Sequence, residues 1–146
     1  MDVNKTVEIL LVEDNDHDAE MALRALKKNK ISNKVIRLKD GEEALEFLFG
    51  TGDFEGRNIH NQPRVILLDL KMPKVDGLEV LKAVRANKDT EKIPIVMLTS
   101  SKEERDVVEG YKLGVNSFIV KPVEFNSFME AVKEIGFYWV ILNELP

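Results

Sequence analysis

Residues 65–73 read VILLDLKMP. The first four residues form an apolar run, and the acidic residue Asp69 follows it. An apolar run of this length without polar interruption is typical of a strand that is covered on both faces in a parallel sheet. In open parallel sheets, ligands bind beyond the carboxyl ends of the strands, near the point where the strand order reverses. The sequence therefore predicts that Asp69 lies at the edge of a sheet where a ligand binds.

Four further apolar runs occur at roughly even intervals, at residues 7–12, 35–38, 95–98 and 118–120. The segments between them have helical period, with apolar side chains three and four residues apart. The residues that mark these helical faces are Ala19, Ala22, Leu23 and Leu26 in the first segment, Leu78, Leu81 and Val84 in the third, and Val107, Val108 and Tyr111 in the fourth. Residues 42–49 and 125–142 supply the second and fifth helices. This alternation predicts an α/β fold, a doubly wound, five-stranded parallel sheet with helices on both faces.

Length and charge limit the kind of protein. The chain has 146 residues, no cysteine, two histidines and a formal net charge of −5. The absence of cysteine excludes disulfides and thiolate metal sites. The acidic balance argues against binding to nucleic acid, which requires clustered Lys and Arg. Since no signal peptide is recognisable and no apolar run approaches the roughly 18 residues of a membrane span, we expect a soluble, cytoplasmic protein without a membrane partner.

Two segments extend beyond the minimal strand–helix pattern. Residues 50–63 are rich in Gly, Asn and charged residues, and we expect an extended surface loop between the second helix and the third strand. After the fifth helix only residues 143–146 follow. We therefore expect one domain over residues 1–146, with a core at about 7–133, a C-terminal helix to about 143 and no output domain.

Polar residues stand where the predicted strands end. The first strand is followed by Glu13 and Asp14, the third by Asp69, the fourth by Thr99 and the fifth by Lys121. Because the carboxyl ends of parallel strands meet at one edge, we expect these side chains to converge. Carboxylates that lie close together repel one another, and Mg²⁺, which prefers oxygen ligands, relieves that repulsion. The remaining ammonium and hydroxyl groups suit the oxygens of a phosphate, so the sequence predicts a site for magnesium and phosphate.

Six short motifs lie at or near these strand ends, in the order ILLVEDN (9–15), DGEEAL (40–45), LLDLKMP (67–73), DG (76–77), LTS (98–100) and VKP (120–122). In order, spacing and position they resemble the receiver domain of two-component response regulators, over roughly residues 7–133. The resemblance implies the flavodoxin-like strand order 2-1-3-4-5. It also implies a signalling domain that takes a phosphoryl group from a partner sensor histidine kinase. Its chemistry would be limited to its own phosphorylation and dephosphorylation, and the sequence does not identify the downstream protein.

The resemblance further implies a role for each residue of the site. Asp69 would be the phosphoacceptor, which attacks phosphorus to form an aspartyl phosphate. Asp14, Asp69 and the backbone carbonyl of Lys71 would hold Mg²⁺, while Glu13 would act largely through bound water. Lys71 departs from the polar or neutral residues that the family often has there, which bears on the lifetime of the phosphate.

The remaining roles concern the fourth and fifth strands. Lys121 would pair with one phosphoryl oxygen, and Thr99 would donate its hydroxyl to another. Phe118 stands where the family has a switch aromatic that turns inward as Thr99 moves; a plain core residue is the alternative. The Lys121–Pro122 peptide bond is typically cis in this family.

Two other kinds of protein remain open as alternatives. A Mg²⁺ phosphohydrolase of the haloacid dehalogenase type also uses a nucleophilic aspartate after an apolar strand, but it requires a second acid two residues on, where this chain has Lys71. A pseudo-receiver adaptor would lack one or more site residues, and this chain retains Asp14, Asp69, Thr99 and Lys121.

Other polar residues receive simpler interpretations. Asp16 and Asp18 are interpreted as acids that favour the N-terminus of the first helix. His17 and His60 are too few for a metal cluster and are interpreted as surface residues.

The C-terminal helix predicts an interaction surface. One stripe is expected to face the sheet, formed by Phe128, Val132, Ile135, Trp139 and Leu142. Apolar side chains also lie outside that stripe, namely Phe125, Met129, Phe137, Tyr138 and Ile141. We therefore expect a homodimer through this helix, with a kinase or effector surface as the alternative. The long loop before Pro63 and the ending from Tyr138 to Pro146 resemble single-domain regulators paired with phytochrome-type sensor kinases.

Overall fold

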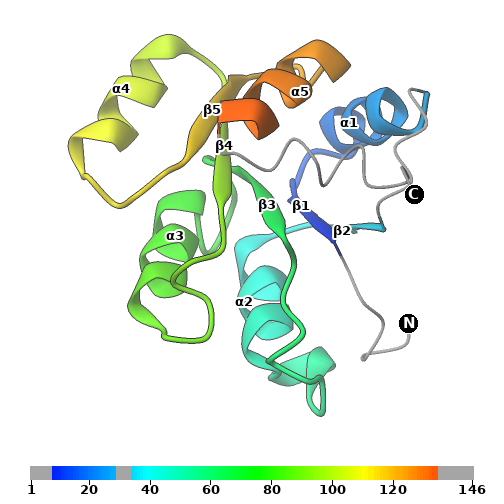
Figure 1. Ribbon diagram of the computed structural model, residues 1–146, viewed down its shortest axis with the longest axis vertical. Helices are drawn as coiled ribbons and strands as arrows, with labels where there is room; N and C mark the ends of the chain where they lie inside the picture. The colour runs from blue at the N-terminus through cyan, green and yellow to red at the C-terminus, as the bar shows by residue number, and fades with distance from the viewer. Residues whose placement is uncertain (1–7, 29–33, 135–146) are drawn as a thin grey trace.

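The computed structural model describes residues 8–28 and 34–134 of the chain. It contains the predicted sheet, whose strands are β1 (Ile9–Val12), β2 (Val35–Leu38), β3 (Val65–Asp69), β4 (Ile95–Thr99) and β5 (Ser117–Val120). Every strand pair is parallel, and the order across the sheet is β2-β1-β3-β4-β5 (Figure 1). The predicted fold class and the strand order implied by the family resemblance are both confirmed.

Within the described residues, the helices are α1 (Asp16–Lys28), α2 (Gly41–Phe49), α3 (Gly77–Ala86), α4 (Lys102–Gly110) and α5 (Phe125–Glu134), with a short 3₁₀ helix, η1 (Gly52–Phe54), after α2. Four of these helices begin after a polar side chain. Asn15, Asp40, Asp76 and Ser101 each accept a hydrogen bond from the backbone N–H three residues further on. Such caps satisfy donors that have no partner inside the helix, which explains where α1, α2, α3 and α4 start.

The core forms two layers, one on each face of the sheet. Successive strand residues point to opposite faces, so Leu10 and Ile66 pack with α2, α3 and α4, whereas Leu11 and Leu67 pack with α1 and α5. Figure 1 shows α1 and α5 together on one side of the sheet and α2 and α3 on the other. Because both faces are covered, β1, β3 and β4 are buried along their whole length, as their unbroken apolar sequences predict.

The register of the central strands prepares the functional edge. Val12 pairs with Leu68, and Asp69 pairs with Leu98. Thr99 in turn pairs with Val120. The residues that follow β1, β3, β4 and β5 therefore emerge beside one another.

The fourth helix differs from the prediction. Val108 is buried, whereas Val107 and Tyr111 are 60% and 53% exposed. Adjacent positions on a helix do not face the same way, and α4 ends at Gly110, so Tyr111 is not on its buried face. The expected apolar face of Val107, Val108 and Tyr111 is therefore wrong.

The loop of residues 50–63 is less extended than predicted, because it folds around a buried arginine. Phe54 and Arg57 are both buried. The Arg57 guanidinium lies 3.8 Å from the centre of the Phe47 ring and donates hydrogen bonds to the carbonyl oxygens of Phe47, at 2.8 Å, and Asn61. Burial lowers the pKa of Arg57. The polar sequence does not reveal this packing, because the charged group finds one partner in the loop, Asn61, and another in α2, Phe47.

Some expectations fall outside the described residues. Val7 is one of them, and the described part of α5 ends at Glu134, so the predicted continuation to Leu142 lies outside as well. Within the described part, Phe128 and Val132 are buried, as predicted. In the ranges 8–28 and 34–134, no helix combines the length and the apolar character that a membrane crossing requires.

Candidate functional site

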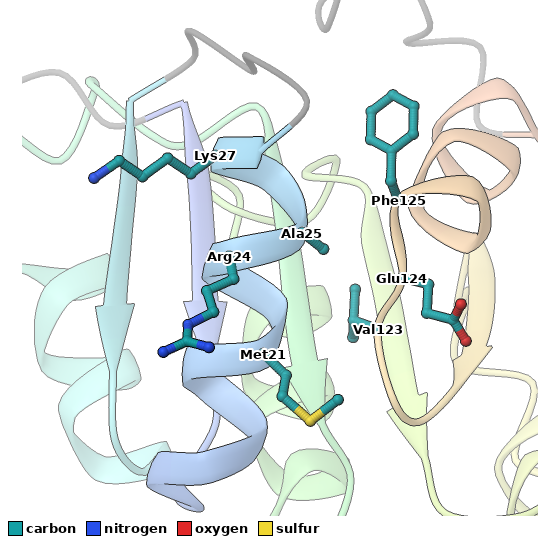
Figure 2. Close-up of a pocket in the computed structure, with 7 residues that line it drawn as sticks. All are labelled: Met21, Arg24, Ala25, Lys27, Val123, Glu124 and Phe125. Carbon is teal, nitrogen blue, oxygen red and sulfur yellow. The ribbon is translucent and has the colours of Figure 1, made fainter.

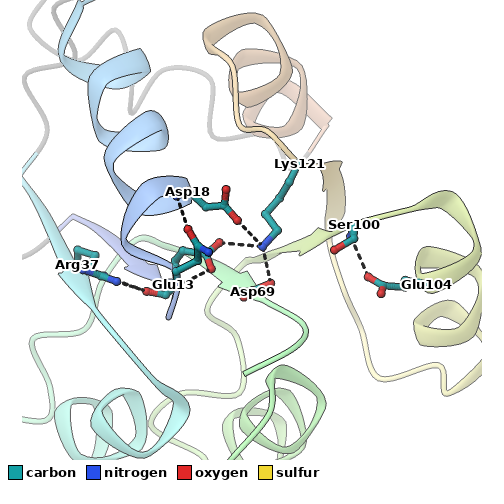
Figure 3. A network of polar contacts seen from close by, with 8 residues as sticks. Glu13, Asp18, Arg37, Asp69, Ser100, Glu104 and Lys121 are labelled. Carbon is teal, nitrogen blue, oxygen red and sulfur yellow. Dashed lines mark hydrogen bonds and ion pairs between the residues drawn. The ribbon is translucent and has the colours of Figure 1, made fainter. Parts of the chain in front are cut away.

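The carboxyl edge of the sheet brings together the five residues predicted there. Glu13 and Asp14 follow β1, Asp69 ends β3, Thr99 ends β4 and Lys121 follows β5. One carboxylate oxygen from each of the three acids lies within 4.8 Å of the others. Glu13, Asp69 and Thr99 are buried, while Asp14 and Lys121 are partly exposed. The site is therefore an acidic cluster at the sheet edge with the Lys121 ammonium beside it; Figure 3 shows Glu13, Asp69 and Lys121.

The Lys121 ammonium lies among three carboxylates. Its Nζ is 3.2 Å from Glu13 Oε1, 3.3 Å from Asp69 Oδ1 and 3.1 Å from Asp18 Oδ2 (Figure 3). Burial alone would lower the pKa of Lys121, but these acidic partners outweigh it and raise the pKa. Lys121 is thus a fixed positive charge next to Asp69.

Asp69 lies in an unfavourable position for a negative charge. Burial, followed by the hydrogen bond and the charge of Glu13, raises the pKa of Asp69 from 3.8 to about 8, and Lys121 only partly offsets this. Ionisation of the whole cluster requires more positive charge than one ammonium supplies. The donor set of carboxylate oxygens, with Asp14 partly exposed, suits a hard divalent cation that keeps some of its waters. The residues present therefore fit a metal of that class.

Glu13 is held in place by two neighbours. Arg37 of β2 donates two hydrogen bonds to its backbone carbonyl, from Nε at 2.9 Å and from Nη2 at 2.7 Å. The backbone N–H of Asn15 donates to Glu13 Oε2 at 3.2 Å. Sequence reasoning missed Arg37, because its only signal is a polar residue within a short strand.

Asp18 lies in the first turn of α1, as predicted, and the structure also brings it to the site. The side chain that caps α1 is Asn15, whose Oδ1 accepts the N–H of Asp18 at 2.8 Å. The Asp18 carboxylate reaches Lys121, which is 103 residues away in sequence. No local pattern marks a contact of that separation. Asp16, in contrast, is exposed and forms an ion pair with Arg37 at 3.0 Å.

Thr99 presents an unpaired hydroxyl at this edge. Its side chain is fully buried, and among the residues that the structure describes its Oγ1 is a buried polar atom without a hydrogen-bond partner. An unpaired buried hydroxyl costs roughly 1–3 kcal/mol. An acceptor oxygen within hydrogen-bond distance of this hydroxyl would recover that energy.

The loop after β3 turns tightly behind Asp69. The N–H of Gly77 donates to the carbonyl of Leu70 at 2.8 Å. A Cβ atom at Gly77 would lie 2.3 Å from the carbonyl oxygen of Asp69. Only glycine allows this approach, so the DG motif at residues 76–77 shapes the loop that carries the acceptor.

Lys71 ties the same loop to the start of α4. Its Nζ lies 2.9 Å from Glu104 Oε2, and Glu104 Oε1 accepts the N–H of Ser100 at 2.8 Å (Figure 3 shows the second contact). The Ser100 N–H and Lys71 lower the pKa of Glu104. The segment that follows Thr99 is therefore linked to the segment that follows Asp69.

Phe118 is partly buried beside α4. It packs against the core on that face, and the guanidinium carbon of Arg105 lies 5.0 Å from the centre of its ring. This position suits a core residue and a switch residue equally, so the switch role stays a prediction. The Lys121–Pro122 bond is cis, as the resemblance implies. His17 and His60 are exposed, as predicted.

A hollow of about 660 Å³ lies apart from this site, between α1 and the start of α5. Met21, Arg24 and Lys27 of α1 line it on one side, and Val123 and Phe125 line it on the other (Figure 2). None of the five strand-end residues borders it. The acidic cluster is therefore a separate feature of the surface.

A parallel sheet in the order 2-1-3-4-5, with acids, a hydroxyl and a lysine at its carboxyl edge, defines the class of the protein. The chain belongs to the family of response regulator receiver domains, whose family model matches residues 9–133. Receiver domains are signalling domains of two-component systems, and they bind a divalent metal. The family that the sequence motifs resemble is therefore confirmed.

Several relatives cover nearly the whole chain. Response regulator Rcp1 of Synechocystis sp. is 38% identical over 138 residues, which span 94% of this chain and 92% of Rcp1. The structure of the bacteriophytochrome response regulator RtBRR is 53% identical with a TM-score of 0.88, and covers 97% of this chain and 85% of its own. For the bacteriophytochrome response regulator AtBRR these values are 52%, 0.86, 92% and 96%.

Two related structures contain a metal or a phosphate, as their descriptions state. A Mn²⁺-bound form of Rcp1 is 38% identical with a TM-score of 0.71, and covers 92% of this chain and 94% of its own. The phosphorylated cyanobacterial phytochrome response regulator RcpA is 32% identical with a TM-score of 0.70, and covers 97% of this chain and 98% of its own.

Proposed function

We propose that this protein accepts a phosphoryl group on Asp69 from a partner sensor histidine kinase and changes its surface in response. The observation that carries the proposal is the Lys121 ammonium, 3.3 Å from Asp69, at a sheet edge where the neighbouring strand β4 ends in the unpaired, buried hydroxyl of Thr99. These two groups supply donors for oxygens that the unmodified site does not contain. The phosphorylated form of the related RcpA supports the same function.

The chemistry assigns one task to each residue. A carboxylate oxygen of Asp69 attacks phosphorus, so an O–P bond forms while the P–N bond of the kinase phosphohistidine breaks and the imidazole leaves with the electron pair. Lys121 binds one phosphoryl oxygen, and Thr99 donates its hydroxyl to another. Both act by position and charge, which is how phosphoryl transfer is mainly catalysed.

Mg²⁺ is the metal that we propose for the acidic cluster. Asp14, Asp69 and the backbone carbonyl of Lys71 would hold it, and Glu13 would act through water. When bound, it neutralises charge on the carboxylates and the phosphoryl oxygens. The Mn²⁺-bound form of Rcp1 and the grouping of the acids within 4.8 Å support a divalent cation here.

The wider context follows from the relatives. We propose that residues 1–146 form a single receiver domain, since Rcp1 and AtBRR are covered over 92% and 96% of their own lengths. The partner kinase is of the phytochrome type, as the descriptions of AtBRR and RtBRR suggest. We also propose that the protein is located in the cytoplasm.

We propose in addition that two copies of the protein form a homodimer through the C-terminal helix.

An enzyme of the haloacid dehalogenase type is less well supported. Such an enzyme needs an acid at the position of Lys71, and Lys71 is paired with Glu104 instead. A pseudo-receiver is also disfavoured, because the acids, the hydroxyl and the lysine are all in place. The domain would therefore act on its own Asp69 only and turn over no external substrate.

Incubation with acetyl phosphate and Mg²⁺, followed by intact-mass measurement, tests the proposal. We expect a gain of one phosphoryl group, lost in excess EDTA and in the Asp69→Asn variant, whose amide is similar in shape but a far weaker nucleophile. Asp14→Asn should greatly raise the Mg²⁺ concentration that half-saturates the reaction. Stable label on another residue of Asp69→Asn, or equal labelling in EDTA, would contradict the assignment.

A further inference from the structure

Asp18 has a contact that the start of a helix does not explain. It occupies the third position of α1, where an acid in a capping box accepts the N–H of the cap residue. Here the cap residue is Asn15, and its N–H donates to Glu13 Oε2 at 3.2 Å instead. Asp18 is thus available for another partner, and its Oδ2 lies 3.1 Å from Lys121 Nζ.

Asp18 also stands apart from the metal-binding acids. The carboxylates that can gather on one ion are Glu13, Asp14 and Asp69, and Asp18 is not among them. Its side chain is 30% exposed, compared with 1% for Glu13 and 4% for Asp69. The geometry therefore connects Asp18 to the site through Lys121.

The Lys121 ammonium has three N–H donors and three carboxylate partners. Glu13 and Asp18 hold it from the end of β1 and from α1, and the remaining partner is Asp69 (Figure 3). When a phosphoryl group occupies Asp69, only this third direction changes its partner. Two fixed acceptors would then keep the end of a flexible four-carbon side chain aimed at the reacting group.

We propose that Asp18 is a positioning residue, which orients the Lys121 ammonium toward the phosphoryl group on Asp69. This inference rests on the proposed function of Asp69. Asp18 itself touches neither the phosphoryl group nor the metal. It acts by limiting the directions that Lys121 can take.

Two variants with the same charge separate positioning from electrostatics. Asp18→Asn removes the charge but keeps an oxygen acceptor for Lys121, whereas Asp18→Ala removes both. At saturating Mg²⁺ we expect Asp18→Ala to be phosphorylated by acetyl phosphate roughly three- to tenfold more slowly than Asp18→Asn. Affinity for beryllofluoride, a phosphoryl mimic, should fall in the same order.

A double-mutant cycle shows whether the effect passes through Lys121. In a Lys121→Ala background, Asp18→Ala and Asp18→Asn should have the same beryllofluoride affinity. Asp16→Ala is the matched control, because it removes an acid from the same turn of α1 that pairs with Arg37 and not with Lys121. We expect this control to stay within about twofold of the wild type.

Three results would overturn the inference. The first is equal behaviour of Asp18→Ala and Asp18→Asn, which would leave a charge effect alone. The second is an undiminished difference between them in the Lys121→Ala background. The third result is a wild-type protein that takes up no phosphoryl group, which would remove the proposed function as well.

If Asp18→Ala unfolds, Asp18→Ser replaces it in these experiments, since serine supports a helix start but is too short to reach Lys121.

Discussion

At the scale of single residues, the surroundings of Asp69 oppose the charge that its reaction requires. Asp69 must be ionised to attack phosphorus, yet burial and Glu13 raise its pKa to about 8. In the folded protein without a metal, the ionised form of Asp69 at the sheet edge is therefore disfavoured. The Thr99 hydroxyl at the same edge is fully buried, so water does not compete for it.

The raised pKa of Asp69 predicts that the stability of the metal-free protein depends on pH. The folded-state pKa of Asp69 is raised from 3.8 to about 8, so the folded protein binds more protons than the unfolded chain between these values. The stabilisation from protonated Asp69 is fully present below about pH 4 and is lost as the pH rises to about 8. The free energy of unfolding of the wild type, relative to Asp69→Asn, should fall by at most about 1.4 kcal/mol per pH unit.

Urea unfolding of both proteins in EDTA at pH 5, 7 and 9 measures this difference. If the free energies of unfolding of the wild type and of Asp69→Asn change in parallel between pH 5 and pH 7, folding does not raise the pKa of Asp69.

At the scale of elements, the loop between α2 and β3 depends on one buried cation. Arg57→Met keeps the apolar stem but leaves the carbonyl oxygens of Phe47 and Asn61 without their donor. We expect a loss of about 2–4 kcal/mol in the free energy of unfolding. Arg64→Met, at a residue whose side chain is 48% exposed, is the control and should change stability by less than about 1 kcal/mol. Equal losses in the two variants would contradict a structural role for Arg57.

The elements next to Thr99 should respond to phosphorylation. Thr99 ends β4, and the segment after it is tied to Lys71 through Glu104, so movement of Thr99 is expected to reach α4 and Phe118 on β5. Beryllofluoride should therefore change amide hydrogen exchange in α4 and β5 more than in α2. Thr99→Ala should abolish this remote change while changes in the loop after β3 remain. A wild-type response confined to the site loops would contradict the switch role of Phe118.

At the scale of the whole molecule, the sequence predicts self-association through the C-terminal helix. Tyr138 and Ile141, outside the described residues, belong to the apolar set that the predicted sheet-facing stripe does not use. Sedimentation should show a dimer at micromolar concentration, and the double change Tyr138→Glu with Ile141→Glu should produce a folded monomer.

The exposed apolar residues of α4 and its end provide the contrasting test. Val107 and Tyr111 are 60% and 53% exposed, so Val107→Glu with Tyr111→Glu removes a second apolar surface. We expect this variant to remain dimeric. The C-terminal helix is not the interface if the dimer dissociates in the variant with Val107→Glu and Tyr111→Glu but not in the variant with Tyr138→Glu and Ile141→Glu. A wild-type protein that is monomeric whether phosphorylated or not would show the same.

From the amino-acid sequence alone, the strands, the helices and the five strand-end residues of the site can be predicted. Strand and helix periods are local properties, and in a parallel sheet the carboxyl ends meet at one edge, so Glu13, Asp14, Asp69, Thr99 and Lys121 could be placed together without coordinates. The strand order came from the family resemblance, because short connections alone do not specify which strands are neighbours.

Contacts between segments that are distant in sequence could not be predicted without the packed structure. The ion pair of Asp18 with Lys121 and the bonds from Arg37 to the Glu13 carbonyl join residues 103 and 24 positions apart. The burial of Arg57 and the exposure of Val107 likewise depend on which side chains a neighbouring element covers. The physical reason is the same in each case: a side chain's pattern in sequence states its polarity, but its partners depend on distances that exist only after the elements have packed.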